Sequence, residues 1–375
     1  MKKVGIITYH HYYNYGTVLQ AYALQKAIEL AGDYSSEIID YRAAEEKKLT
    51  KSQLLGIRIK RIAIYLKEWR RIWRLKRYGS ILSEKNTKFD EFFNNELKVC
   101  SDVYYSYSDL RNNAPLYDVY VTGSDQTWSP KIGLIPAMFL QFAPKGKKRV
   151  AYAPSIGVSN LTGEEKTRMD SWIQGYSSVS CREKGGVALL QSFLKNQKVQ
   201  LVVDPTLLLT QKNWDEIAIN PKIEKPYILC YFIGHRSYYR EYARHLSIQQ
   251  NMPLFFIPVS WVDLINDNDF VKDAGPKEFL GLIKNASLVL TDSFHGTIFS
   301  INYHKDFYSF LKVEGGSKAM DNSRITDILT RFNLSDRLID EGISLAYSPV
   351  DYTLVSPLIE KELAESWAYL KESLS

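Results

Sequence analysis

Short apolar runs alternate with longer stretches of helical periodicity along most of this chain. Residues 4–9 form the first apolar run, residues 17–30 place apolar side chains at close to helical spacing, and residues 37–41 return to an apolar run. Short apolar runs are typical of strands, whereas spacings of three and four residues are typical of one helix face. Strand, helix and strand in this order predict a βαβ unit with a parallel sheet.

The same alternation continues to the C-terminus. Further strands are predicted at residues 118–122, 149–153, 179–181, 199–203, 227–232, 254–257, 287–290 and 307–310. Helices are predicted near residues 89–97, 164–175, 184–194, 238–249, 277–284, 297–301, 323–332 and 357–371. This alternation predicts an α/β protein made of two Rossmann-like, doubly wound domains that face each other across a cleft. We place the domains at residues 1–205 and 206–375, and we expect the last helix (about 357–371) to pack back on the first domain.

A basic helical insertion at residues 47–97 interrupts the first domain. One face of it carries Leu55, Ile59, Ile62, Leu66, Trp69 and Trp73, whose spacing is that of a long helix. Residues 47–78 hold twelve Lys or Arg and one acid, although the whole chain carries only +6. Such a segment fits an anionic membrane surface, nucleic acid, or a solvated helix packed through its apolar stripe, which is the commonest case. Of the two functional alternatives, we expect peripheral contact of residues 47–78 with the anionic inner membrane rather than binding to nucleic acid.

Composition excludes several classes of protein. The chain has 375 residues, 45% of them hydrophobic and 24% charged, which is ordinary for a globular protein of about two domains. Its three cysteines form no C-x-x-C pair, so neither a zinc site nor a disulfide framework is expected. No apolar stretch approaches the length of a membrane span, and the first apolar run is too short for a signal peptide. We expect a cytoplasmic protein that needs no metal or cofactor.

Residues 291–297, with the sequence TDSFHGT, carry the most informative chemistry. They join a predicted strand to a predicted helix, and ligands of open α/β sheets bind at such junctions. The helix N-terminus offers unpaired N–H groups to an anion, and His295 can exchange a proton near neutral pH. Asp292 or Ser293 could equally do no more than cap the helix.

Three more polar turns follow predicted strands. The first combines Asn14 and Thr17 with a glycine that permits close approach of the backbone. The second, at residues 123–128, offers a carboxylate, an amide and an aromatic ring, and the third places Arg182 where it could hold a phosphate or carboxylate. Each could also be structural, as a helix cap, a loop tether or a surface ion pair. The sequence lacks the glycine-rich fingerprints of dinucleotide-binding and P-loop proteins.

Six motifs in this order resemble the polysaccharide pyruvyl transferase family, over residues 1 to about 335. They are residues 14–21 (NYGTVLQA), 121–128 (VTGSDQTW), 152–157 (YAPSIG), 180–183 (SCRE), 203–206 (VDPT) and 291–297 (TDSFHGT). The resemblance implies a glycosyltransferase-B-like fold. It also implies transfer of pyruvate from phosphoenolpyruvate to a sugar hydroxyl pair, forming a ketal during cell-surface polysaccharide biosynthesis. Many members resemble Arg-Leu-His where this chain has Ser293-Phe294-His295, so another cation would have to neutralise the donor.

The resemblance further implies roles for individual residues, with phosphoenolpyruvate as donor and a sugar or lipid-linked oligosaccharide as acceptor. His295 and Asp125 would be the catalytic groups. The donor would be held by Arg182, Ser293, Gly296, Thr297, Lys318 and Arg324. The acceptor would be held by Asn14, Tyr15, Gly16, Thr17, Gln126 and Trp128. Two other functions stay open: a nucleotide-sugar-dependent glycosyltransferase of similar fold, and a non-catalytic carbohydrate- or anion-binding protein.

Overall fold

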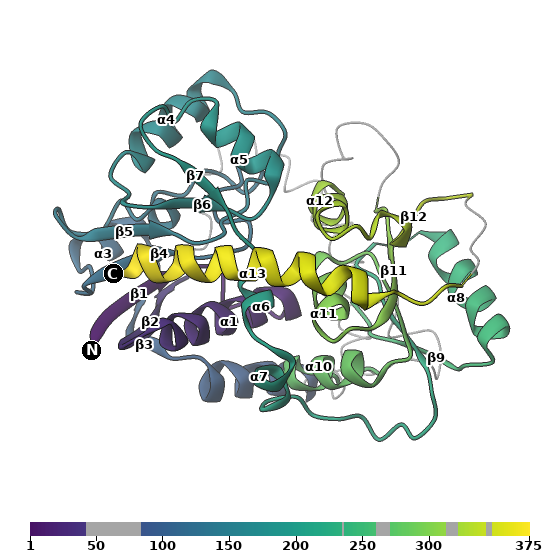
Figure 1. Cartoon of the computed structure of the whole chain (residues 1–375). Helices are drawn as coiled ribbons and strands as arrows, with labels where there is room; N and C mark the ends of the chain where they lie inside the picture. The colour runs from purple at the N-terminus through teal and green to yellow at the C-terminus, as the bar shows by residue number, and fades with distance from the viewer. Residues whose placement is uncertain (43–83, 235, 260–270, 313–321, 343–346) are drawn as a thin grey trace, which may run out of the picture.

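The computed structural model describes residues 1–42, 84–234, 236–259, 271–312, 322–342 and 347–375. They form two five-stranded parallel sheets, one in each half of the chain (Figure 1). The first sheet has the order β3-β2-β1-β4-β5. Its strands are β1 (Lys2–Ile7), β2 (Tyr34–Tyr41), β3 (Val99–Tyr104), β4 (Val119–Thr122) and β5 (Lys148–Ala151). Strands β6 (Val179–Cys181) and β7 (Val199–Leu201) continue beyond β5 through a parallel bridge between Val150 and Ser178.

The second sheet has the order β12-β11-β10-β8-β9. Its strands are β8 (Ile228–Tyr231), β9 (Leu254–Phe256), β10 (Leu288–Thr291), β11 (Asp306–Phe310) and β12 (Leu338–Ile339). Strands β4, β8 and β10 are buried at every residue. Parallel strands covered on both faces need apolar side chains on both, which is why these segments appear in the sequence as unbroken apolar runs.

The helices alternate with the strands along the chain. Those before residue 216 are α1 (Tyr15–Ala31), residues 84–96, α3 (Tyr107–Asn112), α4 (Gly163–Ile173), α5 (Lys184–Gln191), α6 (Pro205–Leu208) and α7 (Gln211–Asp215). Those after it are α8 (Ser237–Gln250), α10 (Pro276–Asn285), α11 (Phe294–Asn302), α12 (Ser323–Arg331) and α13 (Tyr352–Leu374).

Two of these helices begin at the carboxyl ends of central strands and so position the site. Asn14 caps α1, because its side chain accepts from the N–H of Thr17 at 3.2 Å. Ser293 caps α11, because its hydroxyl accepts from the N–H of Gly296 at 3.4 Å. Side-chain caps of this kind fix where a helix starts. The N-termini of α1 and α11 therefore meet between the two sheets.

An apolar core runs continuously through both halves, from α1 to α10 and α11. Tyr15 lies at this junction: its ring stacks on Phe279 with centroids 4.4 Å apart. Its hydroxyl donates to the carbonyl of Ala274 at 2.6 Å. Shared burial of this kind joins the two halves through one apolar core.

The C-terminal helix α13 crosses from the second sheet back over the first, and its end lies near β1 (Figure 1). Three hydrogen bonds attach it there. The N–H of Val203 donates to Ser366 at 2.9 Å, and the Tyr369 hydroxyl donates to the carbonyl of Ala151 at 2.8 Å. Lys2 donates through Nζ to the carbonyl of Ser375 at 2.9 Å.

Several elements differ from the sequence-based expectation. Strands β3 and β12 and helix α3 were not expected, because β3 contains the polar pair Ser101 and Asp102 and β12 is two residues long. Helix α13 begins at Tyr352 rather than 357, because the Asp351 carboxylate accepts from the N–H of Thr353 at 3.0 Å and starts it before Pro357. Most of the basic segment 47–97 lies outside the described residues, as does every residue of 47–78.

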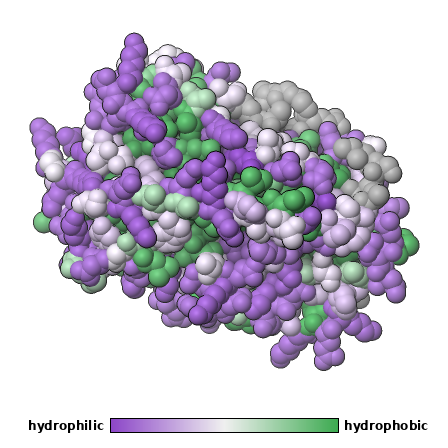
Figure 2. Space-filling model, in the orientation of Figure 1, coloured by the Kyte–Doolittle hydropathy of each residue, from purple (hydrophilic) through white to green (hydrophobic). Residues whose placement is uncertain are grey.

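Figure 2 shows the face that α13 crosses: it is mainly hydrophilic, with separate apolar patches. Among the residues that the structure describes, no helix is both long and apolar enough to span a bilayer.

Candidate active site

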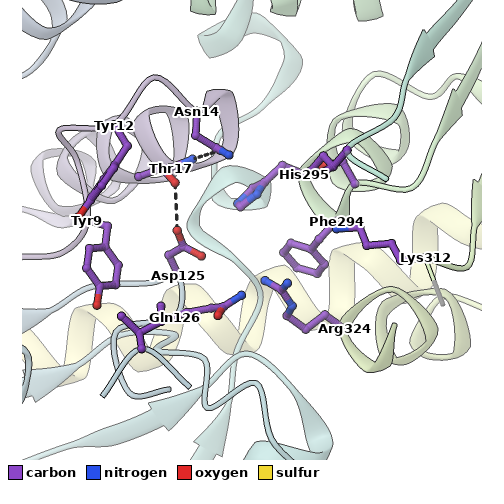
Figure 3. A pocket seen from close by; sticks show the side chains of 13 residues that line it. Tyr9, Tyr12, Asn14, Thr17, Asp125, Gln126, Phe294, His295, Lys312 and Arg324 are labelled. Carbon is purple, nitrogen blue, oxygen red and sulfur yellow. Dashed lines mark hydrogen bonds between the residues drawn. The ribbon is translucent and has the colours of Figure 1, made fainter. Parts of the chain in front are cut away.

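A cavity of about 460 Å³ opens between the carboxyl ends of the two sheets (Figure 3). From the first half it is lined by Tyr9, Tyr12, Asn14, Thr17, Asp125, Gln126 and Ile132. From the second half it is lined by Ile233, Ser293, Phe294, His295, Lys312 and Arg324. The carboxyl ends of parallel strands are the usual place for ligands in such folds.

Asp125 provides the carboxylate of this cavity. It stands after β4 in a left-handed conformation, with φ of 68°, and is held by a bridge to Pro154. A residue with a side chain pays for this conformation in strain, and such residues cluster at functional sites. Its Oδ2 accepts from the hydroxyl of Thr17 at 3.1 Å. Thr17 thereby aims the carboxylate from the neighbouring helix.

His295 occupies the first turn of α11 and is only 8% exposed. Its ring rests on the backbone of Gly16, where a Cβ would overlap Nδ1, and it points into the cavity (Figure 3). Its Nε2 lies 3.8 Å from Oδ2 of Asp204. Burial lowers the pKa of His295 to about 4, and the attraction of Asp204 only partly offsets this effect. The ring is therefore neutral at neutral pH.

Arg182 lies behind the cavity wall with a fully buried side chain. Its Nη1 donates to Asp204 at 2.7 Å and to Ser124 at 3.2 Å, and its Nε donates to Glu183 at 3.3 Å. Burial alone would lower its pKa, but these carboxylates raise the pKa above the usual arginine value. The sequence predicts that Arg182 holds phosphate directly. In this arrangement it does not line the cavity, and its contacts support Asp204 instead.

Two cations from the second half do reach the cavity, Lys312 and Arg324. The Arg324 guanidinium lies 5.8 Å from the ring centre of Phe294. With the Gln126 amide oriented toward it, Oε1 accepts from Arg324 at 3.1 Å, and Figure 3 shows the two side chains facing each other. Lys318, the other expected cation, lies outside the described residues. Lys312 and Arg324 therefore place positive charge on the cavity, whereas position 293 carries a neutral serine.

A sequence model of the polysaccharide pyruvyl transferase family matches residues 14–311. This range contains each of the six motifs and most of the cavity lining. The chain belongs to the polysaccharide pyruvyl transferase family. It is accordingly a transferase.

Solved structures resemble this family member at low sequence identity. The putative UDP-N-acetylglucosamine 2-epimerase from Listeria monocytogenes matches with a TM-score of 0.52 and 10% identity, over 99% of this chain and 91% of that chain. UDP-GlcNAc 2-epimerase from Methanocaldococcus jannaschii matches with a TM-score of 0.47 and 13% identity, over 97% of this chain and 93% of that chain. E. coli heptosyltransferase WaaC with ADP matches with a TM-score of 0.44 and 11% identity, over 96% of this chain and 99% of that chain. No protein of curated function matches the chain. The predicted fold of two Rossmann-like domains is confirmed.

Besides Arg182 and Gly16, four more residues that we expected at the site lie beside the cavity rather than on it. Trp128 is fully buried, stacks on Phe139 and donates through Nε1 to the carbonyl of Met138 at 3.1 Å. The Tyr15 side chain is buried at the junction between the halves, where its hydroxyl donates to the carbonyl of Ala274. Gly296 and Thr297 belong to the first turn of α11: a Cβ on Gly296 would overlap Thr291, and the Thr297 hydroxyl bonds to Ser309 at 2.7 Å. These residues shape the site without lining it, because strand ends bury some of the side chains that follow them.

The structure also adds residues to the site that sequence reasoning did not assign a role. They are Tyr9, Tyr12, Ile132, Ile233, Phe294 and Lys312. Only Phe294 stands inside a motif that could have pointed to it. Across the described part of the chain, no group of three or more His, Cys, Asp or Glu side chains is arranged to hold a metal ion.

Proposed function

We propose that this transferase moves the pyruvyl group of phosphoenolpyruvate onto two hydroxyls of a sugar, forming a cyclic ketal during cell-surface polysaccharide biosynthesis. The observation that carries the proposal is the composition of one cavity. It combines a histidine, a carboxylate and two cations on the rim where two α/β sheets meet. The reaction requires each of these groups.

The cationic side of the cavity suits the donor. Phosphoenolpyruvate carries a phosphate and a carboxylate, and Lys312 and Arg324 can pair with both. The N-terminus of α11, which begins at Phe294, adds backbone N–H donors beside them. Oriented donors of this kind stabilise the negative charge that develops on a departing phosphate.

The opposite side suits a sugar. Tyr9 and Tyr12 meet edge to face with ring centres 6.0 Å apart, and Tyr12 is 56% exposed. An exposed ring can cover the apolar face of a pyranose, while Asn14, Thr17 and Gln126 offer hydrogen bonds to hydroxyls.

The chemistry then divides between Asp125 and His295. Asp125 takes the proton of the first hydroxyl as its oxygen bonds to C2 of the donor, and protonated His295 delivers a proton to the methylene carbon, which becomes a methyl group. The second hydroxyl then attacks the same carbon and the bond to phosphate breaks. Its proton goes to His295, and the proton held by Asp125 leaves with phosphate. Both side chains return to their starting states, and each positioned group contributes roughly 10²–10⁴ in rate.

The acceptor is proposed to be a free or lipid-linked sugar. A lipid-linked acceptor would place the protein at the inner membrane surface, for which the basic residues 47–78 are suited. Flotation with anionic liposomes at low salt tests this part alone. Binding that is lost in neutral liposomes supports it, and absence of binding removes it.

The direct test of the reaction is product analysis. The protein is incubated with phosphoenolpyruvate and a panel of free, nucleotide-linked and lipid-linked sugars. We expect equal release of phosphate and gain of a pyruvate ketal by one acceptor, and both rates should fall roughly 10²–10⁴-fold in His295→Ala. Transfer of a sugar from a nucleotide-sugar, with no use of phosphoenolpyruvate, would instead establish a glycosyltransferase.

A further inference from the structure

We propose that Asp204 is a positioning residue for His295, which holds the imidazole with Nε2–H toward its carboxylate and leaves Nδ1 to exchange the proton in the cavity. This inference rests on the proposed function. Asp204 lies in the 203–206 motif, outside the expected site residues, and it does not line the cavity.

The Asp204 carboxylate is held rigidly. Its Oδ1 accepts from the N–H of Thr206 at 3.0 Å and from the Thr206 hydroxyl at 2.7 Å. Its Oδ2 accepts from Ser124 at 2.9 Å and from Arg182 at 2.7 Å. Four donors on one fully buried carboxylate fix its orientation far more tightly than a single ion pair would.

The same oxygen, Oδ2, is the Asp204 atom that approaches His295. Nε2 of His295 is buried, has no hydrogen-bond partner among the described residues, and lies 3.8 Å from Oδ2 of Asp204. That separation is longer than a hydrogen bond, and catalytic contacts are often long before substrate binds. A carboxylate beside Nε2 favours the tautomer that carries hydrogen there. The other nitrogen, Nδ1, lies against Gly16, and His295 lines the cavity.

The charges around His295 agree with this assignment. Burial lowers its pKa to about 4; Asp204 and Asp125 raise that pKa, and Arg182 and Arg324 lower it. Burial would raise the pKa of Asp204, but the positive charges of Arg182 and of His295 when it is protonated, together with hydrogen bonds from Thr206, outweigh burial and hold that pKa below its ordinary value. Asp204 is therefore ionised beside a neutral ring. An anionic donor in the cavity raises the His295 pKa, so protonation of His295 accompanies donor binding.

The test is Asp204→Asn, which keeps the size of the side chain and removes its charge. We expect phosphoenolpyruvate binding to persist, while kcat falls about 10²-fold and the pH midpoint of kcat moves to lower pH, because the charge that raises the His295 pKa is gone. In the His295→Ala background, Asp204→Asn should lower kcat little further, because the effects of two coupled residues are not additive. The control is Asp170→Asn on exposed helix α4, which should change neither quantity.

The outcomes are distinguishable from failure of the proposed function. A wild-type protein that neither binds nor uses phosphoenolpyruvate refutes the function. Two results overturn the role of Asp204 when the wild-type protein does use phosphoenolpyruvate. One is an unchanged pH profile of kcat in Asp204→Asn, and the other is an equal loss of kcat from Asp204→Asn in the wild-type and His295→Ala backgrounds. If Asp204→Asn does not fold, the ¹⁵N shifts of the wild-type His295 ring decide, assigned by comparison with His295→Gln. A hydrogen on Nε2 supports the inference, and a hydrogen on Nδ1 overturns it.

Discussion

The imidazole of His295 lies directly against the backbone of Gly16, and the two residues begin helices in different halves of the protein. No side chain fits between them. The proposed catalytic group of the second half is therefore positioned by the first half, and the site exists only where the two halves meet.

Gly16→Ala should displace the His295 ring while leaving the rest of the fold intact. A Cβ at this position would overlap Nδ1 and the neighbouring ring atoms. A shift of about 1 Å in a catalytic group can cost about 10²-fold in rate, so we expect a loss of that size in kcat. Steady-state kinetics and thermal melting measure the two effects separately. Gly163→Ala in α4, where an added Cβ meets no atom within 4 Å, is the control; equal kinetics in both variants would contradict the contact.

Arg324→Ala and Lys312→Ala should each weaken donor binding more than they lower kcat. Both side chains line the cavity, and a hydrogen bond to a charged group contributes about 1.5–3 kcal/mol. This corresponds to a rise of roughly 10–100-fold in the dissociation constant of phosphoenolpyruvate. Calorimetry measures it directly. The exposed Lys145→Ala serves as control, and unchanged affinity in both cavity variants would assign the donor to other residues.

Tyr12→Ala should raise the KM of the acceptor and leave donor binding unchanged. Tyr12 is 56% exposed at the cavity mouth, and loss of an aromatic surface that a sugar covers costs on the order of tenfold in affinity. Kinetics with the acceptor varied at saturating phosphoenolpyruvate test this. Tyr105→Ala removes a tyrosine that is 67% exposed but does not line the cavity. A larger effect on the donor than on the acceptor would place the sugar elsewhere.

The stability of the protein should fall as the pH decreases from about 6.5 toward 4, in part because of His295. Its pKa in the folded state is about 4, whereas an unfolded histidine has a pKa of about 6.5. Between these values the unfolded state binds more protons, so the contribution of His295 to stability is lost as the pH falls. Urea unfolding measures the free energy of unfolding at pH 7 and at pH 5. Between these two pH values that free energy should fall by about 2 kcal/mol less in His295→Gln than in the wild-type protein. An identical decrease in both proteins would mean that the ring is not buried in neutral form.

Much of the scaffold could be predicted from sequence, because strand and helix periods differ and buried parallel strands appear as apolar runs. The location of the site followed from the same topology: the polar turns after the strands had to share one edge. Strand β3 was missed because an edge strand needs only one apolar face and its Ser101 and Asp102 are exposed.

The depth of individual side chains could not be predicted. Arg182 looks like a phosphate ligand in the sequence, but its burial depends on Asp204 and Glu183, whose spatial approach no local pattern reveals. Trp128 follows a strand as a ligand-binding residue would, yet it completes the core. Lys312 and Tyr9 stand outside the motifs, and only the folded chain brings them to the cavity.

The central claim is that this cavity binds phosphoenolpyruvate as its donor, and thermal melting of the wild-type protein tests it most directly. Phosphoenolpyruvate, inorganic phosphate and a nucleoside diphosphate are compared at equal millimolar concentrations. A ligand present at about 100 times its Kd stabilises the folded state by about 2.7 kcal/mol. The account predicts a rise in Tm with phosphoenolpyruvate that exceeds the rise with phosphate and is reduced in Arg324→Ala. No rise with phosphoenolpyruvate, together with a rise for the nucleoside diphosphate, would contradict it.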